Sequence, residues 1–146
     1  MSNSVKHILA LSLIKGVGSS FIKKEIPLIN SYIDNIEMLT SIGGKVTLEQ
    51  FNSNLDYAQS IIDECKHQKI EILSIIDDDY PSALKEIKDP PPIIYLKGNV
   101  DIVKKAIAII GTRKSSDLGN LIAQKVGSYF GAEWSICNGL VDGIDK

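Results

Sequence analysis

The sequence contains few of the residues on which several kinds of function depend. In 146 residues it has two cysteines, two histidines and one tryptophan. Cys65 and Cys137 are far apart, so their spacing predicts neither a metal site nor a disulfide framework, and we expect two reduced, mostly buried thiols in a cytoplasmic protein. His7 and His67 have no nucleophile or metal-binding partner near them in the sequence. We therefore predict no metal, no cofactor and no catalytic residue.

Long hydrophobic runs are also missing. The longest apolar runs fall far short of the roughly 20 residues that a membrane-spanning helix requires, so we expect no membrane association. The apolar run at residues 8–14 is short, and Gly16, Val17 and Gly18 follow it without the small-residue pattern of a cleavage site. This favours a buried helix over a signal peptide. Hydrophobic residues make up 44% and charged residues 23% of the chain, as in ordinary globular proteins.

The chain lacks a strong overall charge, but its charges are segregated. The net charge is −2, which argues against a uniformly basic nucleic-acid-binding protein. By segment, the formal charge is +4 for residues 1–24, −8 for 25–96, +4 for 97–125 and −2 for 126–146. The positive charge of the second such segment, residues 97–125, would attract the phosphate backbone of a nucleic acid. The alternative is that its lysines only solvate the surface.

The first positive segment contains a candidate secondary DNA contact. Apolar residues at helical spacing predict a helix over residues 5–14, which Gly16 closes before a second helix. In a helix-hairpin-helix arrangement, the turn at Gly16 and Gly18 would donate backbone N–H groups to a phosphate, and Lys23 and Lys24 would add positive charge. The alternative is that the two glycines form only a tight turn.

The whole pattern predicts an α/β protein with two parts. Short helices at 28–40 and 47–53, the second with a capping box at Thr47, complete a small helical domain over residues 1–52. Residues 53–146 alternate between helix and strand patterns, which predicts the first part of a Rossmann-like parallel sheet. The elements expected there are a helix at 55–67, a strand at 70–76, a short helix, a strand at 93–96, a short helix at 100–105, a strand at 106–110, a helix at 117–131 and a strand at 134–137. Trp134 begins the last strand and is expected to be a core residue.

The loop that begins with Gly111, Thr112 and Arg113 has the properties of a phosphate-binding site. It follows the strand predicted at 106–110 and leads directly into the helix predicted at 117–131. A helix N-terminus offers unpaired N–H groups and the positive end of its dipole, and Gly111 lets the backbone approach an anion closely. Arg113 can grip a phosphate with its planar guanidinium, unless it pairs with a carboxylate such as Asp142 or Asp145. Since ligands bind beyond the carboxyl ends of parallel strands, we expect residues 138–145 to lie beside this loop.

Five blocks of sequence carry a family resemblance. They are Tyr80–Leu84, Ile87–Pro91, Tyr95–Asn99, Ala106–Gly119 and Gly139–Asp145. In this order and spacing they resemble the DNA-processing protein A family, also called DprA or Smf. The resemblance covers the second half of the chain closely and the helical region loosely.

The resemblance assigns roles to residues of both loops. The residues that match the family's phosphate-binding loop are Gly111, Thr112, Arg113, Ser116 and Gly119. Lys114 is a candidate secondary contact. In the second loop Gly139 and Gly143 match, Asn138 stands where the family usually has serine, and Val141 stands where it usually has alanine. Asn138 and Gly139 are expected to bind phosphate as well. The alternative is that either glycine serves only the backbone geometry of the loop. Asp145 is expected to cap or orient the start of a following helix.

The resemblance implies a binding protein rather than an enzyme. It implies a protein that binds single-stranded DNA, acts as a recombination mediator in natural transformation and loads a RecA-type recombinase, with homo-oligomerisation expected. The residues alone leave open a Rossmann-type nucleotide-binding enzyme that uses the same loop. They also leave open a truncated product without full activity, because the resemblance reaches only the first half of the family's Rossmann-like domain.

Overall fold

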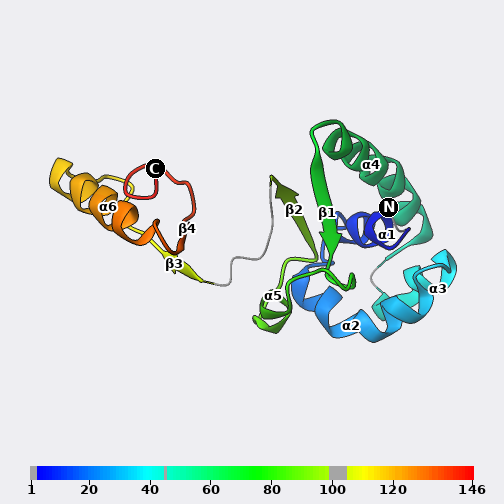
Figure 1. The fold of residues 1–146 in the computed structure, drawn as a ribbon. Coiled ribbons are helices and arrows are strands. Elements are labelled where there is room, and N and C mark those ends of the chain that lie inside the picture. The colour runs from blue at the N-terminus through cyan, green and yellow to red at the C-terminus, as the bar shows by residue number, and fades with distance from the viewer. Residues whose placement is uncertain (1–2, 45, 99–104) are drawn as a thin grey trace. The chain divides into compact units, whose positions relative to one another are not determined.

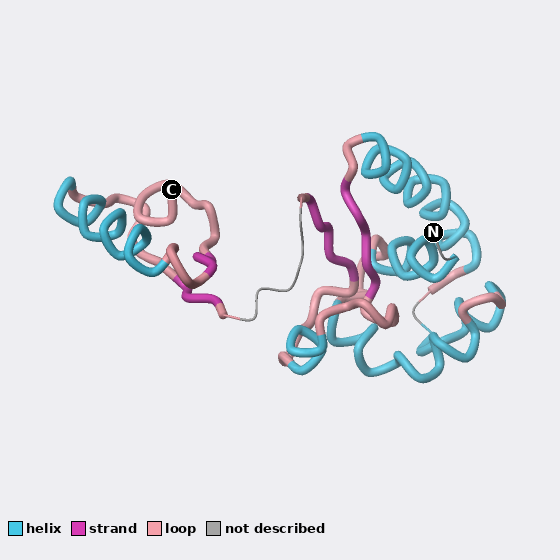
Figure 2. Tube along the Cα trace, viewed as in Figure 1, coloured by secondary structure: helices cyan, strands magenta, loops and turns pink. Residues whose placement is uncertain are grey.

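The computed structural model describes residues 3–44, 46–98 and 105–146, and these form two compact units, Met1–Gly98 and Asn99–Lys146 (Figure 1). The helix predicted at 100–105 falls almost wholly outside the described residues. In the part of the chain that is described, no helix combines the length and the apolar character that crossing a bilayer requires. The α/β class is confirmed, since each unit combines helices with a pair of strands (Figure 2).

The first unit is mainly helical. Its elements are α1 (Asn3–Ser12), α2 (Ser19–Tyr32), α3 (Ile36–Ser41), a 3-10 turn η1 (Ile42–Gly44), α4 (Leu48–His67), β1 (Ile70–Ser74), α5 (Ser82–Glu86) and β2 (Ile93–Lys97). Helices α1 and α4 pack against each other and against β1. Ile8 on α1, Phe51 on α4 and Ile72 on β1 are almost fully buried and contribute to one continuous core. Burial of such side chains supplies about 1.5–3 kcal/mol each.

The helix boundaries differ from the prediction at two places. The helix predicted at 28–40 is divided between α2 and α3, because Asn35 caps α3 by accepting a hydrogen bond from the Met38 amide at 3.1 Å. The helices predicted at 47–53 and 55–67 are one helix, α4, which begins at the confirmed capping box of Thr47. Packing keeps this helix continuous, since Phe51 is buried and Asn54 donates a hydrogen bond to the Ala10 carbonyl.

The predicted domain boundary near residue 52 therefore lies inside α4. The compact units of the structure divide between Gly98 and Asn99 instead. Strands β1 and β2 belong to the same compact unit as α1 and α4. The two compact units thus do not coincide with the predicted division into residues 1–52 and 53–146.

The first pair of strands is antiparallel, and the prediction of one parallel sheet is wrong there. Ile70 is opposite Lys97 and Ser74 is opposite Ile93. A parallel pair requires a crossover that covers one face of the sheet, but α5 has only five residues. The chain turns back instead, and the Ile75 amide extends the ladder by donating to the Pro92 carbonyl.

The second unit has the predicted parallel arrangement. Strand β3 (Ala106–Ala108) lies parallel to β4 (Ser135–Cys137), and α6 (Asp117–Phe130) connects them. Every buried hydrophobic side chain among the described residues belongs to the first unit. Between residues 105 and 146 only Asp145 is buried. Because this core is thin, two predictions about burial are wrong. Cys137 is exposed rather than mostly buried, and Trp134, predicted in the core, is 38% exposed.

Tyr80 gives a testable consequence of packing in the first unit. Its side chain is 2% exposed and its hydroxyl donates a hydrogen bond to the Pro91 carbonyl at 2.7 Å. Burial raises the pKa of Tyr80 above the ordinary value of 10.0. In the unfolded chain the phenol ionises at about pH 10 while the buried phenol remains neutral, so its stabilising contribution is complete below pH 10 and is lost as the pH rises through the folded pKa.

We expect Tyr80→Phe to lower the free energy of unfolding at neutral pH by about 1 kcal/mol, since the Pro91 carbonyl loses its donor. Above about pH 10 this difference should shrink, because only the wild type loses the contribution of Tyr80. Urea unfolding at neutral and alkaline pH measures both effects. Tyr57→Phe is the matched control, since that side chain is 58% exposed. An equal alkaline loss of stability in wild type and Tyr80→Phe would contradict the prediction.

Candidate nucleic-acid interface

The two predicted loops of the second unit are joined by the carboxylate of Asp145. Its Oδ1 accepts a hydrogen bond from the Gly111 amide, and its Oδ2 accepts one from the Gly139 amide, each at 3.1 Å. Asp145 is only 8% exposed. Charged hydrogen bonds of this kind stabilise by about 1.5–3 kcal/mol. The carboxylate thus holds the start of one loop against the start of the other.

The backbones of the two loops are also in direct contact. The Ile144 amide donates to the Thr112 carbonyl at 3.2 Å. Gly143 has φ +105°, and a Cβ there would lie 2.1 Å from the Thr112 carbonyl oxygen and 2.7 Å from the Arg113 Cα. Only glycine fits this position. At Gly111, a Cβ would lie 2.6 Å from the Ile144 side chain. The expected neighbourhood of the two loops is therefore present.

The hydroxyls of the first loop order its own backbone. Ser116 is the N-cap of α6, and its Oγ accepts a hydrogen bond from the Gly119 amide at 3.2 Å. Thr112 Oγ1 accepts from the Lys114 amide at 3.2 Å. A serine hydroxyl that accepts one hydrogen bond still has its own proton to donate. Ser116 can therefore cap the helix and donate to an anion at the same time.

Arg113 is the one arginine in the chain, and it is exposed. The alternative of an ion pair with Asp142 or Asp145 is absent from the structure: Asp142 pairs with Lys146 at 2.9 Å, and Asp145 accepts from the two glycine amides. Arg113 forms no ion pair with any residue in the described ranges. Its guanidinium is thus free to bind an anion beside the N-terminus of α6, and the exposed Lys114 adds a second positive charge.

Gly111 and Gly139 have a role that the sequence did not reveal. Both were predicted to bind phosphate, but in the structure their amides donate to Asp145. The sequence predicts that Asp145 caps or orients a following helix, whereas in the structure its carboxylate joins the two loops. The sequence signal for this role is an acidic residue at the end of the second glycine-containing loop. Asn138 also serves its own loop, since its side chain accepts from the Leu140 amide at 3.1 Å.

In the predicted secondary contact near the N-terminus, the side chains of Lys23 and Lys24 interact with other groups of the chain. The turn at Gly16 is present, with φ +91°. However, Lys23 donates to the Ile87 carbonyl at 2.5 Å, and Lys24 pairs with the neighbouring Glu25 at 3.5 Å. The Ser20 hydroxyl, in the first turn of α2, donates to the carboxylate of Asp89.

Asp89 adds a negative charge beside this turn. Together with Gly16, Gly18 and Ser20 it lines a small hollow at the start of α2. A carboxylate there interacts favourably with the helix N-terminus and repels a phosphate. The structure thus places a negative charge beside this turn, and the helix-hairpin-helix contact and the tight turn both stay open as interpretations.

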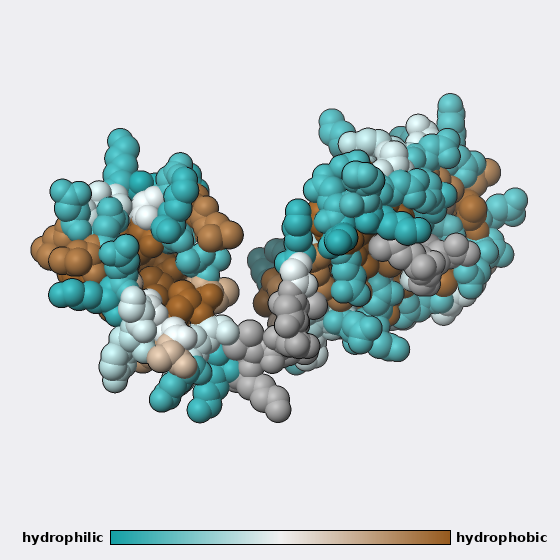
Figure 3. Space-filling model, turned by 45° about the horizontal axis from the view of Figure 1, so that its top comes forward, coloured by the Kyte–Doolittle hydropathy of each residue, from teal (hydrophilic) through white to brown (hydrophobic). Residues whose placement is uncertain are grey.

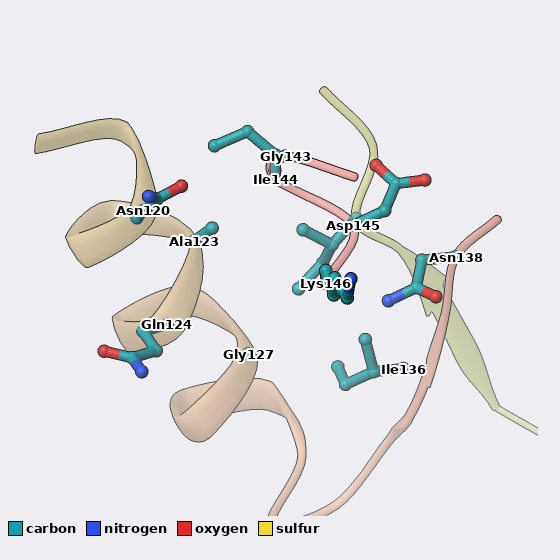
Figure 4. A pocket seen from close by; sticks show the side chains of 11 residues that line it. Asn120, Ala123, Gln124, Gly127, Ile136, Asn138, Gly143, Ile144, Asp145 and Lys146 are labelled. Carbon is teal, nitrogen blue, oxygen red and sulfur yellow. The ribbon is translucent and has the colours of Figure 1, made fainter. Parts of the chain in front are cut away.

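A hollow of about 480 Å³ lies between α6 and the second loop (Figure 4). Asn120 and Gln124 line it from α6, and Ile136 and Asn138 line it from β4 and the residue that follows. These side chains offer neutral hydrogen-bonding groups and apolar surface, and Asp145 and Lys146 add charged groups to the lining. Among the described residues, no group of three or more histidine, cysteine or acidic side chains is arranged to hold a metal ion.

Comparison with known proteins gives concordant results. The family model described as DNA recombination-mediator protein A matches residues 71–146, which include β1 from its second residue, β2, the second strand pair, α6 and the two joined loops. The DNA processing protein DprA of Streptococcus pneumoniae is 40% identical over 79 residues, covering 53% of this chain and 28% of that protein. DprA of Bacillus subtilis is 31% identical over 104 residues, covering 69% of this chain and 34% of that protein.

The fold is similar to that of a solved member. The X-ray structure of DNA processing protein A from Streptococcus pneumoniae aligns with a TM-score of 0.63 and 27% identity, covering 99% of this chain and 51% of the other. The chain thus spans about half of that structure and about a third of the curated relatives. Since the family model matches more than half of the chain, this protein belongs to the DNA recombination-mediator protein A family.

Proposed function

We propose that this chain binds single-stranded DNA through the loop between β3 and α6, as part of a DNA-processing and recombination-mediator function. The observation that carries the proposal is the exposed Arg113 guanidinium, which has no ion-pair partner in the described ranges and lies beside a helix N-terminus. Guanidinium groups and helix N-termini both favour phosphate. Phosphate contacts supply affinity without reading sequence, as a DNA-processing protein requires.

The contacts that hold the loop support this proposal. The bonds to Asp145 and the contact of Gly143 with Thr112 fix the backbone before any ligand arrives. A site that is already ordered loses less conformational entropy on binding. The segment from 97 to 125 has a formal charge of +4, which attracts a polyanion over a longer range.

The finer parts of the proposal rest on the family. We infer that the bound strand is transferred to a RecA-type recombinase during natural transformation, in the cytoplasm, and that the protein acts as a homo-oligomer. The description of the family as a recombination mediator supports the recombinase part of this inference. The chain spans only part of those relatives, so we assign no residue to a protein partner.

The test compares a single-stranded oligonucleotide with a mononucleotide across a range of salt concentrations. We expect the oligonucleotide to bind, with an affinity that falls steeply as salt rises, because each neutralised phosphate releases counterions. The mononucleotide should bind weakly, since it offers one phosphate group. Tight, salt-insensitive binding of the mononucleotide would overturn the proposal and favour a nucleotide-binding enzyme.

A further inference from the structure

Three aromatic rings are clustered at the end of α6 farthest from Arg113. Tyr129 packs edge-on against Phe130 with 5.0 Å between ring centroids, and Phe130 packs edge-on against Trp134 at 6.4 Å. We call these residues the aromatic cluster. Tyr129 is 78% exposed and Trp134 is 38% exposed, so the cluster is open to solvent at both ends. Figure 3 shows apolar side chains at the surface of the second unit, interspersed with hydrophilic ones.

Two lysines accompany the aromatic cluster. The Lys105 ammonium lies 5.8 Å from the centre of the Trp134 ring, within the range of a cation–π interaction. Lys125 is exposed and lies four residues before Tyr129 on α6, so the two share a face of the helix. Glu133 is the acidic residue adjacent to the cluster in sequence, and the local balance is positive.

This combination fits one kind of ligand. A protein interface would also account for the exposed rings, but the two ammonium groups beside them favour an anionic ligand. Nucleobases present flat π faces and are joined by phosphates, so they use both components. The edge-on packing of Tyr129 against Phe130 also restrains the exposed ring, which lowers the entropy that stacking would cost.

We propose that the aromatic cluster is a second contact for single-stranded DNA, where Tyr129 stacks on a nucleobase and Lys105 and Lys125 bind the adjoining phosphates. The proposal rests on the proposed function of the second unit. Helix α6 has 14 residues, which corresponds to a length of about 20 Å. Arg113 and the aromatic cluster therefore lie near opposite ends of α6, and a single strand can extend from one to the other.

Trp134 can serve as an intrinsic fluorescence probe, because it is the one tryptophan in the sequence. The titration uses an oligothymidylate of about 20 nucleotides, longer than the roughly 4–16 that a single-strand site occupies. An abasic strand of the same length has the same phosphates and no bases. We expect the oligothymidylate to change the fluorescence of Trp134 and to bind about tenfold more tightly than the abasic strand, since stacking requires a base.

The variant Tyr129→Leu removes the stacking surface and keeps an apolar side chain. We expect it to weaken oligothymidylate binding by about tenfold and to leave abasic-strand binding unchanged. Tyr57→Leu, an exposed tyrosine of the first unit, is the control and should bind as the wild type does. Equal affinity of the wild type for both strands, or wild-type affinity of Tyr129→Leu, would overturn the inference while leaving the proposed function intact. Failure of both strands to bind would overturn both.

Discussion

Replacing Arg113 with alanine should weaken binding of single-stranded DNA by about tenfold to a hundredfold at low salt. A charged hydrogen bond contributes about 1.5–3 kcal/mol, and this guanidinium has no ion-pair partner within the described residues that would compete for it. The loss should be similar for strands of any sequence, because a phosphate contact reads no base. Fluorescence anisotropy with two labelled oligonucleotides of different sequence measures the change.

The salt dependence separates a direct contact from a general effect of charge. Arg113→Ala should flatten the slope of log affinity against log salt by about 0.7, the value for one phosphate on a single strand. Lys66→Ala removes the same charge from an exposed position in the first unit and should leave affinity and slope nearly unchanged. Arg113→Lys keeps the charge without the planar fork, so its affinity should be intermediate. Unchanged affinity in Arg113→Ala would remove this residue from the interface.

Features that depend on neighbouring residues in the sequence were predictable. The capping box at Thr47 involves side chains three residues apart, and Ser116 caps α6 in the same local way. The parallel pairing of β3 and β4 follows from an intervening helix long enough for a crossover. The loop with Arg113 was found because a strand, a glycine and a helix follow one another directly along the chain.

Features that depend on distant residues were not predictable in this way. Asn54 lies between the two predicted helices, but in the structure it is inside α4 and donates a hydrogen bond to the Ala10 carbonyl, 44 residues away. The antiparallel pairing of β1 and β2 depends on how the chain between them turns back. The amides of Gly111 and Gly139 resembled phosphate donors because a periodicity argument cannot show that a carboxylate 34 residues after Gly111 already occupies them.

Asp145 offers the sharpest test of how the site is held together, because charge and geometry predict opposite results. Removing a negative charge near a phosphate site should strengthen DNA binding; for charges about 10 Å apart the effect is about 0.4 kcal/mol in water and about 1.7 kcal/mol at an effective dielectric of about 20, which suits the buried Asp145 better. Removing the carboxylate also leaves two amides without an acceptor, and each lost bond costs about 1–3 kcal/mol. The geometric effect is larger, so Asp145→Ala should weaken binding by tenfold or more and lower the stability of the second unit.

Two further variants separate these contributions. Asp145→Asn removes the charge but keeps one acceptor oxygen, so its affinity should fall between that of the wild type and that of Asp145→Ala. Asp142→Ala removes an equal charge whose carboxylate, among the described residues, bonds to Lys146 alone, and it should bind as tightly as the wild type or slightly more tightly. Oligonucleotide affinity and hydrogen exchange of the Gly111 and Gly139 amides measure the two effects. If Asp145→Ala bound DNA more tightly than Asp142→Ala does, the carboxylate would act on DNA through its charge alone, and joining the loops would not be its contribution to binding.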